Sequence, residues 1–150
     1  MKATLISAIL LSAVVLSHAQ ALPRHVVIKS WERLTYPRLA RVARIEGVVS
    51  LTLTVGKNGA VEKVELRQGH PVLATAAIEN AKKIVIRCSD CSWDEDVTVP
   101  LIYVFRLVGK EGDGKTRVHL YQDNGTPDDP NRWRIEVLTN PPVVNYTTAC

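Results

Sequence analysis

The feature that most constrains the fold is a stretch of alternating apolar and polar residues that leads into an Asn-Gly turn. Residues 48–55 alternate Val or Leu with Ser or Thr, a pattern typical of a strand with one buried and one solvated face. Asn58-Gly59 tolerates the positive backbone angles that a tight hairpin demands. We therefore expect residues 60–68 to pair antiparallel with 48–56. The buried side chains of the returning strand are expected to be Val64 and Leu66.

Two helices are predicted to flank this hairpin. Tyr36-Pro37 opens the first, because proline suits the first helical position, and Gly47 ends it. Pro71 opens the second, which we expect to end near Arg87. The apolar stripes are Leu39, Val42 and Ala43 in the first helix, and Leu73, Ala76, Ala77, Ala81 and Ile84 in the second.

A long strand is predicted over residues 97–108, and it is apolar on both faces. A strand of this kind is either covered on both faces or available to a covering partner. The expected fold class is α+β, with two helices packed on one face of a three-stranded antiparallel sheet. One face of the strand carries Val97, Val99, Leu101, Tyr103, Phe105 and Leu107, and the other carries Ile102 and Val104.

The segments outside this unit are less regular. Residues 22–32 form a lead-in in which 26–28 is expected to be a short strand. Beyond Gly109, residues 116–121 and 133–138 are expected to form a hairpin around a polar loop, and 140–150 a loose tail.

The N-terminus has the order of a secretory signal. Met1-Lys2 is followed by an apolar run and then by Ala19-Gln20-Ala21, so we expect export to the periplasm with cleavage near Ala21. An uncleaved anchor is the alternative, although the run is shorter than the roughly 20 residues that span a bilayer. The remaining chain suffices for one core.

The cysteines admit three interpretations. An exported chain can keep disulfides, and a local Cys88–Cys91 disulfide is favoured. A redox pair is less favoured because the two residues follow a helix C-terminus, where the dipole opposes a thiolate. A zinc site would have to recruit Cys150 and a distant histidine, such as His119 or His70, so no metal or cofactor is expected.

The order of elements resembles a known family. Tyr36-Pro37, Glu46-Gly47, the strand that follows, Asn58-Gly59, the Ala-rich second helix and the final Phe105 occur in the same order as in the C-terminal domain of TonB. The resemblance covers residues 33–108, which leaves 109–150 as a C-terminal extension. TonB proteins also have a membrane anchor and a long proline-rich spacer, and neither pattern is present in this sequence.

The resemblance implies partner binding by β-augmentation, in which a peptide of an outer-membrane transporter adds a strand to the sheet. A homodimer, or the C-terminal hairpin, could cover the same edge, and Tyr36 could be a core side chain or a contact in the groove. The expected partner-binding residues are Tyr36, Pro37, Val97, Val99, Leu101, Ile102, Tyr103, Val104 and Phe105.

The sequence therefore predicts an exported module that binds envelope or outer-membrane transport proteins. No catalytic constellation stands out, and a chain with net charge +4, concentrated before residue 48, has no nucleic-acid reading motif. We expect neither a nucleic-acid partner nor a small-molecule substrate. The alternatives are a thiol-disulfide protein that uses Cys88 and Cys91, and an anchored energy transducer that retains residues 1–21.

Overall fold

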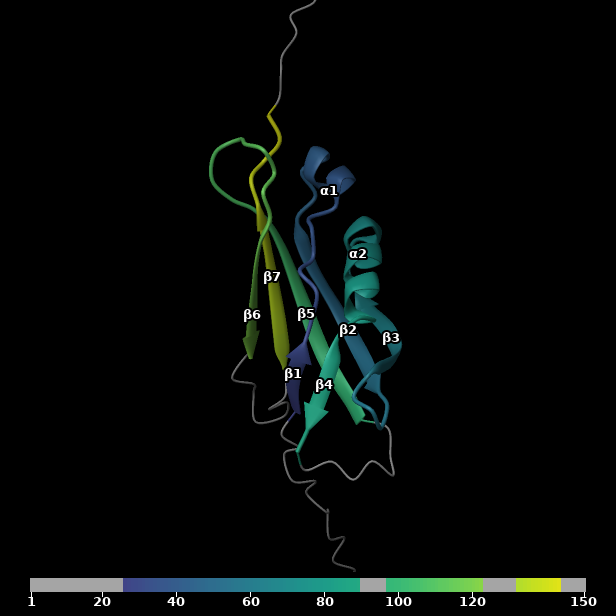
Figure 1. Cartoon of the computed structure of the whole chain (residues 1–150). Coiled ribbons are helices and arrows are strands. Elements are labelled where there is room, and N and C mark those ends of the chain that lie inside the picture. Colours follow the sequence, from purple (N-terminus) through teal and green to yellow (C-terminus); the bar gives the residue numbers. More distant parts are fainter. Residues whose placement is uncertain (1–25, 90–96, 123–131, 144–150) are drawn as a thin grey trace, which may run out of the picture.

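A computed structural model describes residues 26–89, 97–122 and 132–143 of the chain, and it has an α+β architecture (Figure 1). The main sheet has five strands in the order β3-β2-β5-β7-β6, and a separate small sheet pairs β1 with β4. The elements are β1 (Val26–Ser30), α1 (Arg38–Val42), β2 (Gly47–Val55), β3 (Val61–Gln68), α2 (Pro71–Ala81), β4 (Val85–Cys88), β5 (Val97–Leu107), β6 (Arg117–Gln122) and β7 (Trp133–Thr139).

The predicted hairpin is confirmed as β2 and β3. Its turn rests on Gly59, which has φ 81°, and on the Asn58 side-chain oxygen, which accepts a hydrogen bond from the Ala60 N–H at 2.9 Å. Val64 is partly buried against the core, but the expected burial of Leu66 is wrong, since 45% of it is exposed. The reason is that β3 is the outermost strand on its side of the sheet.

The first helix is much shorter than predicted. α1 ends at Val42, and Arg44 with φ 54° turns the chain out of the helix. The predicted stripe faces solvent, with Leu39 74% and Val42 61% exposed, while Ala40 is the buried residue of α1. A single helical turn can bury only one side, and here the buried side chain is a small alanine.

The second helix also ends early. α2 stops at Ala81 instead of near Arg87, and residues 85–88 form β4. This β-branched segment pairs antiparallel with β1, where Val26 lies opposite Cys88, and it thereby confirms the short N-terminal strand. Tertiary pairing has overridden the helical pattern at this point.

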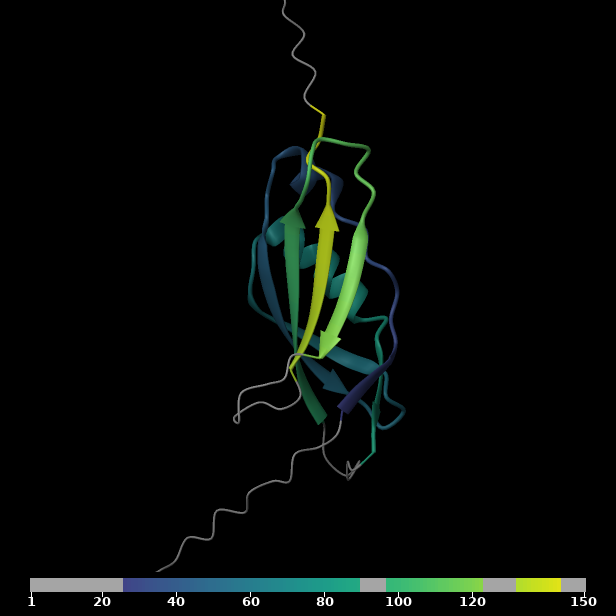
Figure 2. The same ribbon diagram turned by 90° about the vertical axis from the view of Figure 1, so that its left-hand side faces the viewer.

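The core lies on one face of the main sheet. Inward rows of β2, β5 and β7 are buried against α2, α1 and the small sheet, and in Figure 2 α2 lies behind β5, β7 and β6. The opposite face of the sheet carries no helix among the described elements (Figures 1 and 2).

The C-terminal extension changes the sheet. The predicted hairpin is confirmed as β6 and β7, which pair antiparallel. However, β7 also pairs parallel with β5, so the sheet has five strands and is mixed, not three-stranded and antiparallel. The alternation of apolar and polar residues predicts both strands. It does not predict which strand of the sheet they pair with.

Candidate partner-binding site

The predicted partner-binding strand, β5, lies inside the sheet. One side of its backbone pairs with β2 and the other with β7, from Leu101 opposite Trp133 to Leu107 opposite Thr139. Along this stretch both edges of β5 are therefore occupied by the chain itself. Of the alternatives considered for this edge, the one observed is that the C-terminal hairpin covers it.

Most of the predicted contact side chains lie in the core. Their inward row is almost fully enclosed, whereas Ile102 is partly exposed and Val104 is buried on the opposite face of the sheet. The buried inward residues are Val97, Val99, Leu101, Tyr103 and Phe105.

Tyr36 closes the core at the start of α1. Its hydroxyl donates to the Ile45 carbonyl at 2.7 Å, and its ring meets Phe105 edge to face at 5.5 Å. Burial, with a smaller contribution from the nearby Glu46 carboxylate, raises the pKa of Tyr36 to about 12. Of the two interpretations of this residue, the core position is the one observed, and Pro37 beside it is partly buried.

Tyr103 connects the sheet to the elements above it. Its hydroxyl donates to Asn80 Oδ1 at 2.9 Å, and Asn80 Nδ2 donates to the Glu32 carbonyl at 2.8 Å. Burial raises the pKa of Tyr103 well above its usual range. These two bonds fix β5, α2 and the lead-in as one unit.

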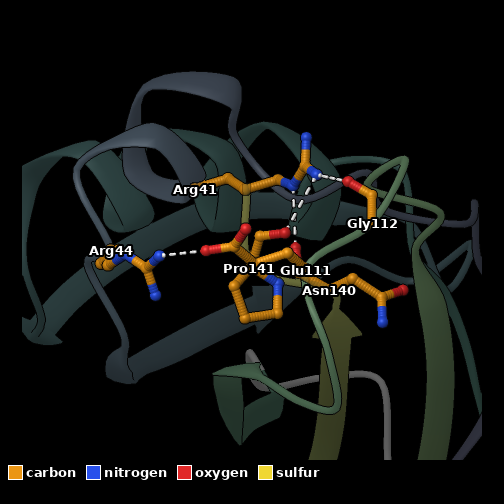
Figure 3. Close-up of polar contacts among 6 residues, drawn as sticks. All are labelled: Arg41, Arg44, Glu111, Gly112, Asn140 and Pro141. Atoms are coloured by element: carbon orange, nitrogen blue, oxygen red, sulfur yellow. Dashed lines mark hydrogen bonds and ion pairs between the residues drawn. The ribbon is translucent and has the colours of Figure 1, made fainter. Parts of the chain in front are cut away.

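An arginine ties the extension to α1 (Figure 3). Arg41 donates through Nε to the Asn140 carbonyl at 2.8 Å and through Nη2 to the Gly112 and Pro141 carbonyls. Beside it Arg44 pairs with Glu111 at 3.1 Å. Arg41 therefore bridges a short helix and both ends of the β6–β7 extension.

Further hydrogen bonds hold the junction between the extension and the segment around α1. Asn140 Nδ2 donates to the Val108 and Lys110 carbonyls at 3.2 and 3.1 Å, and the Tyr36 N–H donates to Thr116 Oγ1 at 3.2 Å. Gly114 has φ 80°, and a Cβ there would lie 2.5 Å from the Arg41 guanidinium carbon. Glycine is therefore needed where the chain passes Arg41.

Sequence reasoning missed this junction because only the apolar stripe of the first helix was expected to make contacts, and Arg41 is not part of that stripe. The only local signal was the run Gly109-Lys-Glu-Gly-Asp-Gly114, whose glycines indicate a loop of unusual backbone angles. Nothing in that run identifies a partner in a helix some seventy residues earlier.

The two outer strands of the sheet, β3 and β6, differ in how well their free edges are protected against pairing with a strand of another molecule. β3 has two irregularities in its register with β2, and Glu65 forms ion pairs with Lys63 at 2.8 Å and Arg67 at 3.4 Å. The Lys63 ammonium lowers the pKa of the Glu65 carboxyl. Bulges and charges of this kind are the usual means of preventing edge-to-edge pairing.

β6 lacks these devices within the described residues. It pairs with β7 in an unbroken register from Arg117 to Gln122 and contains no acidic residue. Tyr121 is 46% exposed and stacks on His119 at 6.1 Å. β6 is thus the regular outer strand to which a further strand can pair.

The residues of the thiol and metal alternatives lie only partly within the described structure. Cys88 is buried at the end of β4, whereas Cys91 and Cys150 lie outside the described residues, so the disulfide stays a prediction. Across the part of the chain that the structure describes, no three His, Cys, Asp or Glu side chains gather as metal ligands. Over the same residues no helix has the length and apolarity to cross a membrane.

The fold is a small α+β module whose main sheet has two outer strands, β3 and β6. Residues 32–107 match the family described as Gram-negative bacterial TonB protein C-terminal, so the chain belongs to this family and is a protein-binding module with no enzymatic role. Membership implies a location in the bacterial envelope and TonB-like interactions with outer-membrane transporters. Searches of curated proteins and of solved structures each returned no match.

The match ends where the extension begins. Its last residue, 107, is also the last residue of β5, so β6 and β7 lie beyond the matched segment. The extension adds two strands to the sheet at the edge of the family's domain.

Proposed function

We propose that this chain is an exported protein-binding module that engages outer-membrane transport proteins by β-strand augmentation, and that the added strand pairs with the outer edge of β6. Family membership supports the class of partner. The observation that carries the choice of edge is the unbroken register of β6, with neither a bulge nor an acidic side chain. Regular, exposed edges of this kind accept added strands.

The energetics of β7 argue against β5 as the accepting edge. β7 buries Trp133, Ile135 and Val137 against the core, and burial of side chains of this size is worth about 1.5–3 kcal/mol each. Displacing the strand would thus cost about 5–9 kcal/mol of apolar burial. A partner at β6 needs no such displacement.

The residues that the sequence predicted to bind the partner instead stabilise the sheet that carries β6. Tyr36, Pro37 and the inward row of β5 hold the sheet together beneath the extension. Ile102 and Val104 lie on the open face, two strands in from β6. The residues proposed to flank the partner strand are His119 and Tyr121.

Site-specific photo-crosslinking in a Gram-negative envelope tests the proposal. A photoreactive residue replaces His119 or Tyr121 on β6 and, as matched controls, Lys63 or Arg67 on β3. We expect adducts with an outer-membrane transport protein, identified by mass spectrometry, from the β6 positions only. Adducts from β3, or an adduct of the chain with itself at β6, would contradict the proposal, and the second result would indicate a homodimer.

We also propose that the signal segment is removed on export. Residues 1–25 lie outside the described residues, so the support for removal is the pattern Ala19-Gln20-Ala21. The intact mass of protein recovered from the envelope should correspond to a chain that starts near Leu22. Retention of Met1 would instead favour the anchored energy transducer.

A further inference from the structure

The outer strand β6 presents a different chemistry on each of its faces. Val118 and Leu120 point to the helix-bearing side, where they pack on the core. Arg117, His119 and Tyr121 alternate with them and are exposed on the open face. A strand that pairs with β6 would continue this alternation, because side chains of neighbouring strands fall in register on each face.

The open face of β5, β6 and β7 is positively charged. It carries Arg106, Arg117 and Arg134, which the strand registers place on the same face, and Glu136 is its one acidic residue in these described strands. That carboxylate already accepts a hydrogen bond from the Tyr121 hydroxyl at 3.5 Å. The arginines therefore outnumber the carboxylate on the open face of these three described strands.

The other outer strand shows the contrast. On β3 the basic side chains of Lys63 and Arg67 both pair with Glu65, so each of these two cations already has a carboxylate partner within the strand. Arg117 of β6 is exposed, and no carboxylate of the described residues pairs with it. Charge complementarity thus distinguishes the two edges.

We infer that the strand accepted by β6 alternates apolar with acidic residues, with its apolar row beside Val118 and Leu120 and a carboxylate beside Arg117. This inference rests on the proposed function and names the chemistry of the partner. Each cross-strand pair of opposite charges should tighten binding by up to about fivefold relative to a neutral pair. Like charges directly opposite each other weaken pairing by a similar factor.

Two short synthetic peptides of equal length provide the test, one alternating valine with glutamate and the other valine with lysine. Each carries a fluorophore, and the anisotropy of the label reports binding to the mature chain. We expect the glutamate peptide to bind several-fold more tightly at low salt, and the preference to shrink as salt screens the exposed charges.

Two variants locate the effect. Arg117→Glu on β6 should weaken the glutamate peptide several-fold and strengthen the lysine peptide, because it reverses the sign of the facing charge. Arg67→Glu on β3 is the matched control and should change neither affinity. Circular dichroism of both variants confirms that the fold is intact.

The outcomes separate this inference from the proposed function. Equal binding of both peptides with an intact crosslink at His119 and Tyr121 would overturn the acidic preference and leave augmentation at β6 standing. Binding of neither peptide would also overturn the inference. A change caused by Arg67→Glu as large as that of Arg117→Glu would overturn the choice of β6 itself.

Discussion

At the scale of single residues, Arg41 is the side chain on which the extension depends most. Its planar guanidinium donates in two directions to three backbone carbonyls, of Gly112, Asn140 and Pro141. An ammonium group is a point charge and cannot reproduce this fork. The carbonyls that Arg41 satisfies belong to segments that meet only in the folded chain.

Arg41→Ala should lower the free energy of unfolding by about 2 kcal/mol, since hydrogen bonds to a charged group are lost and carbonyls lose their partner. Arg41→Lys should cost about half as much. Arg38→Ala, at an exposed position of the same helix, should stay within about 0.5 kcal/mol of the original chain. Urea unfolding measures all three, and an Arg41→Ala chain as stable as Arg38→Ala would refute the role of Arg41.

Tyr36 predicts how stability depends on alkaline pH. Its pKa is about 12 in the folded chain against about 10 when unfolded, so the folded state holds the phenol proton more tightly. The resulting stability is complete below pH 10 and is lost as the pH rises toward 12.

Tyr36→Phe should therefore cost about 1 kcal/mol at neutral pH, through the lost bond to Ile45, and should flatten the fall in stability between pH 10 and 12. Urea unfolding at a series of pH values measures the slope. An unchanged slope for Tyr36→Phe would show that this phenol does not titrate differently on folding.

At the scale of elements, the sequence predicted the strands better than their partners. Alternation and Asn58-Gly59 fix β2 and β3 locally, and the β6–β7 hairpin follows from similar patterns. The parallel pairing of β7 with β5 joins segments about thirty residues apart, and periodicity cannot choose between a covered edge and an open one. The predicted stripe of α1 was wrong for a related reason, because no element among the described residues covers Leu39 and Val42.

The inward row of β7 predicts that the extension is part of the core. Ile135→Ala should destabilise the chain by about 2–5 kcal/mol, as truncation of a fully buried isoleucine does. His119→Ala on the exposed face of β6 should cost less than about 0.5 kcal/mol. Thermal unfolding distinguishes these values. A mild effect of Ile135→Ala would mean that β7 packs only loosely.

At the scale of the whole molecule, the family's domain and its extension form one folding unit. Arg41 connects α1 to both ends of the extension, Tyr36 contacts Thr116, and β7 completes the row of buried side chains on β5. The accepting edge of the sheet is therefore displaced from β5 to β6. This displacement is the central claim, because the proposed partner site and its charge both follow from it.

Truncation of the chain after residue 108 should consequently not yield a stable domain. It removes β7 and exposes buried side chains of β5 that lie beside those of β7 on the same face of the sheet, among them Tyr103 and Phe105. We expect the truncated chain to aggregate or to lose its cooperative unfolding transition, as seen by sedimentation and circular dichroism. A soluble, cooperatively folded truncation would show that the extension is an accessory.

Native-state amide hydrogen exchange followed by NMR tests the central claim most directly. If β7 is a permanent strand of the sheet, its amides should exchange with the same opening free energy as those of β5, near that of global unfolding, while the outward amides of β6 exchange much faster. If β7 instead opened at a small fraction of that free energy while the bonds between β5 and β2 stayed closed, the hairpin would be a displaceable cover. β5 would then be the accepting edge, contrary to this account.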